Sequence, residues 1–195
     1  MIDAIVLAAG QSKRMGKPKP LLRFNDKTFL EQVISVLKLC DVDRITVVLG
    51  SEAQTIRKTV DLSGTNVVIN EEYEKGQLSS LIAAIEQTPQ TTEAILICLV
   101  DNPFITEEVV NKVVGKFKET NSPIVVPVFD GERGHPALFS RSLFAELSSA
   151  PEEQGARAVL YSNEEKVLEV ETSEKGIRIS IDTPDDYRRH FGSDP

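Results

Sequence analysis

Five basic side chains follow the first apolar segment of the chain. Every charged residue between positions 4 and 25 is basic: Lys13, Arg14, Lys17, Lys19 and Arg23. The whole chain is acidic, with 30 acidic and 22 basic residues, so this segment concentrates positive charge. Gly10 and Gly16 let backbone N–H groups approach an anion closely. These features predict a binding site for a nucleoside triphosphate, although a solvated basic loop fits the same residues equally well.

The spacing in this loop is neither the Walker phosphate-binding pattern nor the Gly-x-Gly-x-x-Gly pattern of dinucleotide-binding folds. The second predicted strand also ends in Leu49-Gly50-Ser51, without the acidic residue that binds a ribose in those folds. A dinucleotide-dependent oxidoreductase is therefore disfavoured.

A carboxylate follows the most apolar segment of the chain. Asp101 comes directly after the run from Ile95 to Val100, which reads as a buried strand. A carboxylate at that position can hold Mg²⁺, which prefers oxygen ligands and substrate phosphates. From these residues alone, an aspartate that begins a turn before Pro103 is the alternative.

Strand-like and helix-like segments alternate through the first two thirds of the chain. Strands are predicted at 2–7, 44–49, 67–69, 94–100 and 124–126, and helices from Thr28, at 78–87 and from Thr106. Nearly continuous apolarity in the strands indicates burial on both faces, as in a parallel sheet covered by helices. The carboxyl ends of such strands share one edge, where ligands bind.

The pattern changes after residue 127. The sequence predicts a strand–turn–strand unit within 127–139, strands at 167–170 and 177–181, and a helix that begins at Thr183-Pro184. We therefore expect a single-domain three-layer α/β/α sandwich over residues 1–195, with a Rossmann-like, mostly parallel sheet and a mixed C-terminal portion.

Composition excludes several classes of protein. The net charge of −8 argues against a nucleic-acid partner, and no apolar run approaches the ~20 residues of a membrane helix. No cationic segment precedes the first apolar run, so no signal peptide is expected. Cys40 and Cys98 form neither a metal-binding spacing nor a disulfide framework. We expect a cytoplasmic protein.

The first loop resembles a family signature. Leu7-Ala8-Ala9-Gly10-x-Ser12-x-Arg14-Met15-Gly16-x-x-Lys19 is similar to the signature of MobA-like nucleotidyltransferases, which build molybdenum cofactor dinucleotides. Similar motifs follow along the chain: Gly76-x-x-Ser79-Ser80-Leu81, Asp101-x-Pro103, Arg133-Gly134-His135-Pro136, Gly155-Ala156-Arg157 and Asp182-Thr183-Pro184. The His-Pro and Gly-Ala-Arg motifs favour the molybdenum cofactor cytidylyltransferase branch, which implies a nucleotide-diphospho-sugar transferase-like fold.

The resemblance implies a role for each matching residue. Lys19, Arg14 and Asp101 would be catalytic, and Asp101 and Asp182 would bind Mg²⁺. The nucleotide would contact Leu7, Ala8, Ala9, Gly10, Ser12, Arg14, Gly16, Lys19, Gly76, Ser79 and Ser80. His135, Pro136 and Arg157 would face the acceptor. Residues 1–105 would mainly bind the nucleotide and residues 106–195 mainly the acceptor.

The activity implied is transfer of CMP from CTP to a phosphorylated acceptor, molybdopterin in the first instance, with release of pyrophosphate. Ala9 replaces a glycine that is usual in the related guanylyltransferases, and its methyl group would favour cytosine over a purine. A sugar phosphate or another phosphorylated alcohol is the alternative acceptor. A further alternative is a maturation partner that carries finished cofactor to a molybdenum hydroxylase.

Overall fold

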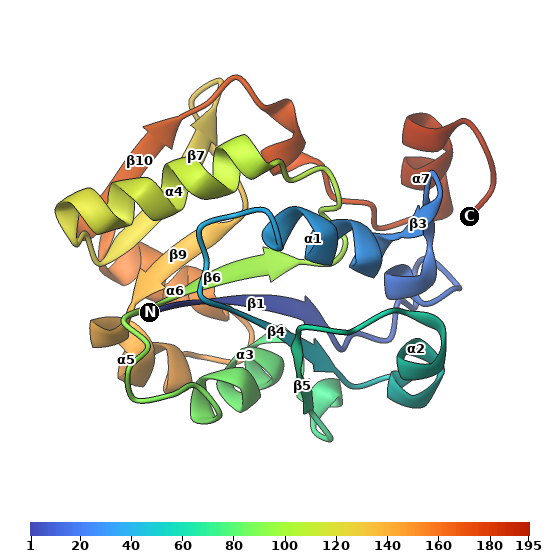
Figure 1. Cartoon of the computed structure of the whole chain (residues 1–195), viewed down its shortest axis with the longest axis horizontal. Helices are drawn as coiled ribbons and strands as arrows, with labels where there is room; N and C mark the ends of the chain where they lie inside the picture. Colours follow the sequence, from blue (N-terminus) through green and yellow to red (C-terminus); the bar gives the residue numbers. More distant parts are fainter.

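The computed structural model describes all residues from 1 to 195. Its centre is an eight-stranded sheet with the order β10-β7-β9-β6-β1-β4-β5, and β8 pairs with β7 at the side (Figure 1). The strands are β1 (Ile2–Ala8), β4 (Arg44–Leu49), β5 (Asn66–Ile69), β6 (Ala94–Leu99), β7 (Ile124–Phe129), β8 (Glu132–Arg133), β9 (Ala137–Ser140) and β10 (Val167–Glu171). A separate hairpin joins β2 (Arg23–Phe24) to β3 (Lys27–Thr28).

Most neighbouring strands are parallel, and the antiparallel pairs are confined to the late strands. β1 runs parallel to both β4 and β6, whereas β9 runs antiparallel to both β6 and β7. β8 is also antiparallel to β7. The predicted α/β fold, with a mostly parallel sheet and a mixed C-terminal portion, is therefore confirmed.

Helices cover both faces of the sheet (Figure 1). They are α1 (Phe29–Leu37), α2 (Ala53–Thr59), α3 (Gln77–Glu86), α4 (Glu107–Thr120), α5 (Phe144–Ser148), α6 (Ala156–Ser162) and α7 (Pro184–Phe191). Side chains of α1, α2, α4 and α7 share one core cluster with Ala4, Val6 and Ala8 of β1. Those of α3, α5 and α6 share the other with Ile5 and Leu7. Because alternate residues of β1 enter different cores, the strand is apolar without interruption from Ala4 to Ala8.

One predicted strand is wrong. The segment expected as a strand over 177–181 begins in a 3₁₀ turn, Lys175–Arg178, and then runs without strand pairing to Asp182. Its carbonyl groups accept hydrogen bonds from the Asn102 side chain and the His135 backbone instead of from a neighbouring strand. The apolar side chains of Ile177 and Ile181 are buried all the same, which explains the strand-like pattern.

No helix combines the length and the apolarity that a transmembrane span requires.

The capping box at the start of α1 generates a stability prediction. Thr28 Oγ1 accepts from the backbone N–H of Glu31 at 3.2 Å, and Glu31 Oε2 accepts from the backbone N–H of Thr28 at 2.7 Å. We expect Thr28→Ala to lower the free energy of unfolding by about 1 kcal/mol, as measured by urea denaturation. Thr59→Ala, at an exposed position near the end of α2, is the control and should change it by less than about 0.5 kcal/mol. Equal losses in the two variants would contradict the capping argument.

Candidate active site

A cavity lies at the carboxyl ends of β1 and β6. It has a volume of about 460 Å³ and is bordered by the loop after β1, the end of β6, the start of α3 and Asp182. Because β1 and β6 are adjacent and parallel, the loop that leaves one strand and the aspartate that follows the other emerge side by side. The edge predicted from the alternation of strands and helices is thus the edge where the cavity lies.

The loop after β1 is held by its own backbone. Ser12 and Gly16 adopt left-handed conformations, with φ of 53° and 74°. The carbonyl of Ser12 accepts hydrogen bonds from the N–H groups of Met15 and Gly16, both at 3.0 Å. Ser12 Oγ accepts from the N–H of Lys19 at 2.9 Å, and the side chain of Met15 is buried. The loop therefore returns the chain to the cavity where η1 (Lys19–Leu21) begins.

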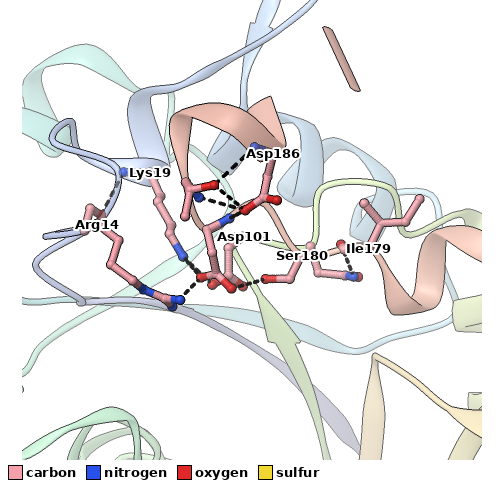
Figure 2. A network of polar contacts seen from close by, with 10 residues as sticks. Arg14, Lys19, Asp101, Ile179, Ser180 and Asp186 are labelled. Carbon is pink, nitrogen blue, oxygen red and sulfur yellow. Dashed lines mark hydrogen bonds and ion pairs between the residues drawn. The ribbon is translucent and has the colours of Figure 1, made fainter. Parts of the chain in front are cut away.

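Lys19 lies between two carboxylates. Its Nζ is 2.8 Å from Oδ2 of Asp101 and 2.5 Å from Oδ1 of Asp182. The Lys19 side chain is only 13% exposed, so these contacts are shielded more than ordinary surface ion pairs. Figure 2 shows Lys19 and Arg14 extending toward the carboxylates from the same side. Arg14 Nη2 contacts Asp182 Oδ1 at 2.9 Å from a more exposed position, at 69%.

Asp182 is positioned by the start of α7. Thr183 caps this helix, and its Oγ1 accepts from the N–H of Asp186 at 3.2 Å. Asp186 Oδ2 in turn accepts from the N–H groups of Thr183 and Asp182, at 2.9 and 3.2 Å (Figure 2). The hydrogen bonds from Thr183 lower the pKa of Asp186, so its carboxylate remains ionised as an acceptor. The predicted helix start at Thr183-Pro184 is confirmed, and it fixes the backbone of Asp182.

The Asp101–Asp182 pair fits a divalent cation. Both carboxylates contact one ammonium nitrogen, which shows that a single small cation can touch both. Their oxygen ligands and the open cavity beside them match the needs of Mg²⁺ or Mn²⁺, which take their remaining ligands from water and phosphate.

Most of the residues expected at the nucleotide line this cavity. They are Leu7, Ala8, Ala9, Gly10, Ser12, Arg14, Lys19, Gly76 and Ser80, and the two expected metal ligands, Asp101 and Asp182, line it as well. Gly16 and Ser79 do not. Gly16 closes the turn of the loop, and the Ser79 hydroxyl donates to the carbonyl of Gly76 at 2.8 Å. Ser80 receives a hydrogen bond from Asn70 Nδ2 at 3.0 Å.

The residues expected at the acceptor do not line the cavity. Pro136 is buried where β9 begins, and Arg157 is exposed on α6. His135 Nδ1 is buried without a hydrogen-bond partner. Burial lowers the pKa of His135, the charge of Asp101 opposes this effect and the charge of Arg157 adds to it. His135 is therefore neutral at pH 7, and it lies near both a candidate metal ligand and the exposed arginine.

Sequence reasoning missed several residues that line the cavity. They are Gln11, in the loop after β1, and Tyr73, Glu74 and Gln77 in and after η2 (Tyr73–Lys75). Gln11 Nε2 donates to Glu74 Oε1 at 3.2 Å, which links the loop to η2. The one sequence signal for the position of Tyr73 is Gly50. A Cβ there would come within 2.6 Å of Tyr73 Cβ, so only glycine lets Tyr73 pack beside Ala9.

The lowered pKa of His135 predicts a pH dependence of stability. The unfolded chain gains a proton on this residue as the pH falls through its usual pKa of 6.5, whereas the folded chain resists it until lower pH. Stability therefore falls as the pH falls from 7 to 5, by at most about 1.4 kcal/mol per pH unit. Urea denaturation at several pH values should show a shallower slope for His135→Gln. His190→Gln, at the exposed histidine of α7, should keep the wild-type slope, and a loss of slope there instead would contradict the assignment.

Comparison with known proteins gives consistent results. Residues 4–167 match the MobA-like NTP transferase domain. The chain is 30% identical over 188 residues to the molybdenum cofactor cytidylyltransferase of Escherichia coli K12, covering 95% of this chain and 93% of the relative. It is 26% identical over 200 residues to nicotine blue oxidoreductase of Paenarthrobacter nicotinovorans, covering 96% and 95%. That second relative is named for a redox activity.

Solved structures share the whole fold. Rv0371c of Mycobacterium tuberculosis H37Rv superposes with a TM-score of 0.89 at 31% identity, over 98% of this chain and 97% of that one. A complex of Rv0371c with manganese superposes with a TM-score of 0.83 at 27% identity, over 98% of each chain. A domain match over most of the sequence, with a relative at 30% identity along nearly its full length, shows that the chain belongs to the MobA-like NTP transferase family of nucleotidyltransferases.

Proposed function

We propose that this protein is a Mg²⁺-dependent cytidylyltransferase that transfers CMP from CTP to molybdopterin. The observation that carries the proposal is the contact of Lys19 with both Asp101 and Asp182. It gathers a phosphate-binding cation and two metal-binding carboxylates at one cavity. The relative named as a molybdenum cofactor cytidylyltransferase supports the choice of nucleotide and acceptor.

In the proposed reaction, a phosphate oxygen of the acceptor attacks the α-phosphorus of CTP. A P–O bond forms there as the bond to the β-phosphate breaks, and pyrophosphate leaves with its electron pair. The attacking phosphate is already ionised at neutral pH, so the step requires no strong general base. This chemistry suits a cavity whose lining residues include no histidine.

Each group in the cavity then has a defined task. Backbone N–H groups between Gly10 and Gly16 hold the triphosphate, and Arg14 and Lys19 neutralise the charge that develops on it. Asp101 and Asp182 hold Mg²⁺, which supplies neutralisation of phosphate charge when bound. With Mg²⁺ on the two carboxylates, the ammonium group of Lys19 would contact a phosphate oxygen instead.

Selection of cytosine is assigned to the wall beside Ala9. Ala9 is buried and lines the cavity with Leu7 and Ser80. Tyr73 closes the same side over Gly50. The methyl group of Ala9 takes up space that a purine needs, and the Ser80 hydroxyl offers a polar contact to the base.

The acceptor is assigned to the side of His135, Pro136 and Arg157. Arg157 is exposed, and the charges of both Arg157 and Asp101 act on the pKa of His135, which supports this assignment. We infer further that residues 1–195 act as one nucleotidyltransferase domain. Asp182, from the second half of the chain, completes the nucleotide side of its site. The free thiols Cys40 and Cys98 support a reducing compartment such as the cytoplasm.

Pyrophosphate release from a panel of nucleotides and acceptors tests the proposal. With Mg²⁺ and molybdopterin, we expect turnover with CTP to exceed that with GTP or ATP by at least about tenfold. Asp101→Asn should lower turnover by about 10²-fold or more without unfolding the chain. A preference for GTP would remove the Ala9 argument, and turnover only with a sugar phosphate would replace the acceptor. Cofactor delivery to a molybdenum hydroxylase that survives Asp101→Asn would favour a carrier role.

Replacement of Lys19 should separate metal binding from catalysis. Lys19→Met removes the charge between the two carboxylates, so the free protein should bind Mn²⁺ about tenfold more tightly by isothermal titration. Turnover with CTP should nevertheless fall by about 10²-fold or more, because the phosphates lose their cation. Lys58→Met, at an exposed position on α2, should change neither quantity. Weaker Mn²⁺ binding in Lys19→Met would contradict the geometry.

A further inference from the structure

Asp101 and Asp182 meet although no strand pairing joins their segments. Asp101 follows β6, and Asp182 ends an irregular stretch that begins at Lys175. We propose that Asn102 is a positioning residue that fastens this stretch to the end of β6 and thereby sets the geometry of the metal-binding pair. The inference rests on the proposed function of Asp101 and Asp182.

The side chain of Asn102 forms two hydrogen bonds with the irregular stretch of residues 175–182. Its Nδ2 donates one hydrogen bond to the carbonyl of Gly176 at 3.1 Å and another to that of Ile179 at 2.6 Å. Figure 2 shows the contact at Ile179, beside Ser180 and close to Asp101. Asn102 is 3% exposed, so water does not compete for these bonds. Both hydrogens of one amide group thus hold a carbonyl inside the 3₁₀ turn Lys175–Arg178 and the carbonyl directly after it.

Neighbouring backbone contacts leave little room for this stretch to move. The N–H of Ile181 donates to the carbonyl of Asp101 at 2.8 Å, and that of His135 donates to the carbonyl of Ile177 at 2.9 Å. A Cβ on Gly176 would lie 2.5 Å from the carbonyl oxygen of Phe104. The stretch is therefore confined between the loop after β6 and the segment before β9, and Asn102 is the side chain that bridges it to the first of these.

The Asn102 side chain acts through the two N–H groups of its amide, because its oxygen has no partner. Oδ1 is buried and has no hydrogen-bond partner, which is unfavourable for an amide group. An apolar side chain would avoid this cost, but it would leave the carbonyl of Ile179 unpaired and that of Gly176 with only the backbone N–H of Ile179 at 3.1 Å. An aspartate would place its charge against the same two carbonyl oxygens. Only an amide of this length donates twice without adding a charge.

Asp186 and Asn102 therefore hold different parts of the segment that ends at Asp182. Asp186 fixes the backbone of Asp182 from the side of α7, and Asn102 fixes the preceding residues from the side of β6. Loss of Asn102 leaves the phosphate loop untouched, since Ser12 and Lys19 are held by their own hydrogen bonds. Metal binding should therefore weaken while binding of CTP without metal is preserved.

Asn102→Ala tests this assignment, with Asn163→Ala as a matched control. Asn163 is also 3% exposed, and its Nδ2 donates to the carbonyl of Val159 at 3.0 Å and to Glu146 at 2.8 Å, away from the cavity. Three quantities are measured on the full chain: amide hydrogen exchange of residues 176–182, Mn²⁺ affinity by electron paramagnetic resonance, and CTP affinity without metal. For Asn102→Ala we expect exchange to accelerate and Mn²⁺ to bind 10- to 100-fold more weakly, with unchanged CTP affinity. Asn163→Ala should keep wild-type values for all three.

Wild-type exchange or wild-type Mn²⁺ affinity in Asn102→Ala would overturn the proposal, as would an equal loss in Asn163→Ala. If Asn102→Ala does not fold, Asn102→Ser, which retains one donor, is measured in its place and should show the same changes at smaller size. The exchange measurement needs neither nucleotide nor metal. It therefore decides the role of Asn102 even if the wild-type protein transfers no CMP, an outcome that would reject the proposed function separately.

Discussion

The contact of one ammonium group with two carboxylates is the constraint on which the site depends. The negative charges of Asp101 and Asp182 repel each other, because both carboxylates contact one ammonium nitrogen. Lys19 offsets this repulsion in the free protein. The same lysine is the cation best placed for a polyphosphate in the cavity. Under the proposed function, the residues of the site thus balance its charge until a metal ion and a triphosphate bind.

The sheet positions two of the three groups and the C-terminal helix positions the third. β1 and β6 deliver the phosphate loop and Asp101, because they are adjacent and parallel. α7 packs against the hairpin that follows Lys19, and Tyr187 donates a hydrogen bond to the carbonyl of Arg23 at 2.8 Å. Aromatic rings join the two: Phe24, Phe29, Phe104, Tyr187 and Phe191. The helix that Asp182 precedes is therefore tied to the segment that carries Lys19.

Sequence reasoning succeeded where a local pattern has one physical meaning. The apolar runs of β1, β4 and β6, the helix start at Thr28 and the helix start at Thr183-Pro184 all form as predicted. It failed over 177–181. Side chains there alternate between buried and exposed as in a strand, but the backbone groups form hydrogen bonds with loop residues and not with a neighbouring strand. It also gave no role to Asn102 or Tyr73, because their contacts lie with residues distant in the sequence.

By itself, the sequence determined which residues carry charge, which segments form strands, and that the strand ends must share an edge. Hydrophobic patterning and capping are local, so they can be read in one dimension. The family resemblance predicted that Asp182 joins Asp101 and Lys19, but only the tertiary structure decided which atoms meet and how residues 175–182 are held. That geometry depends on single hydrogen bonds and close backbone approaches between distant segments, which leave no periodic signal in the sequence.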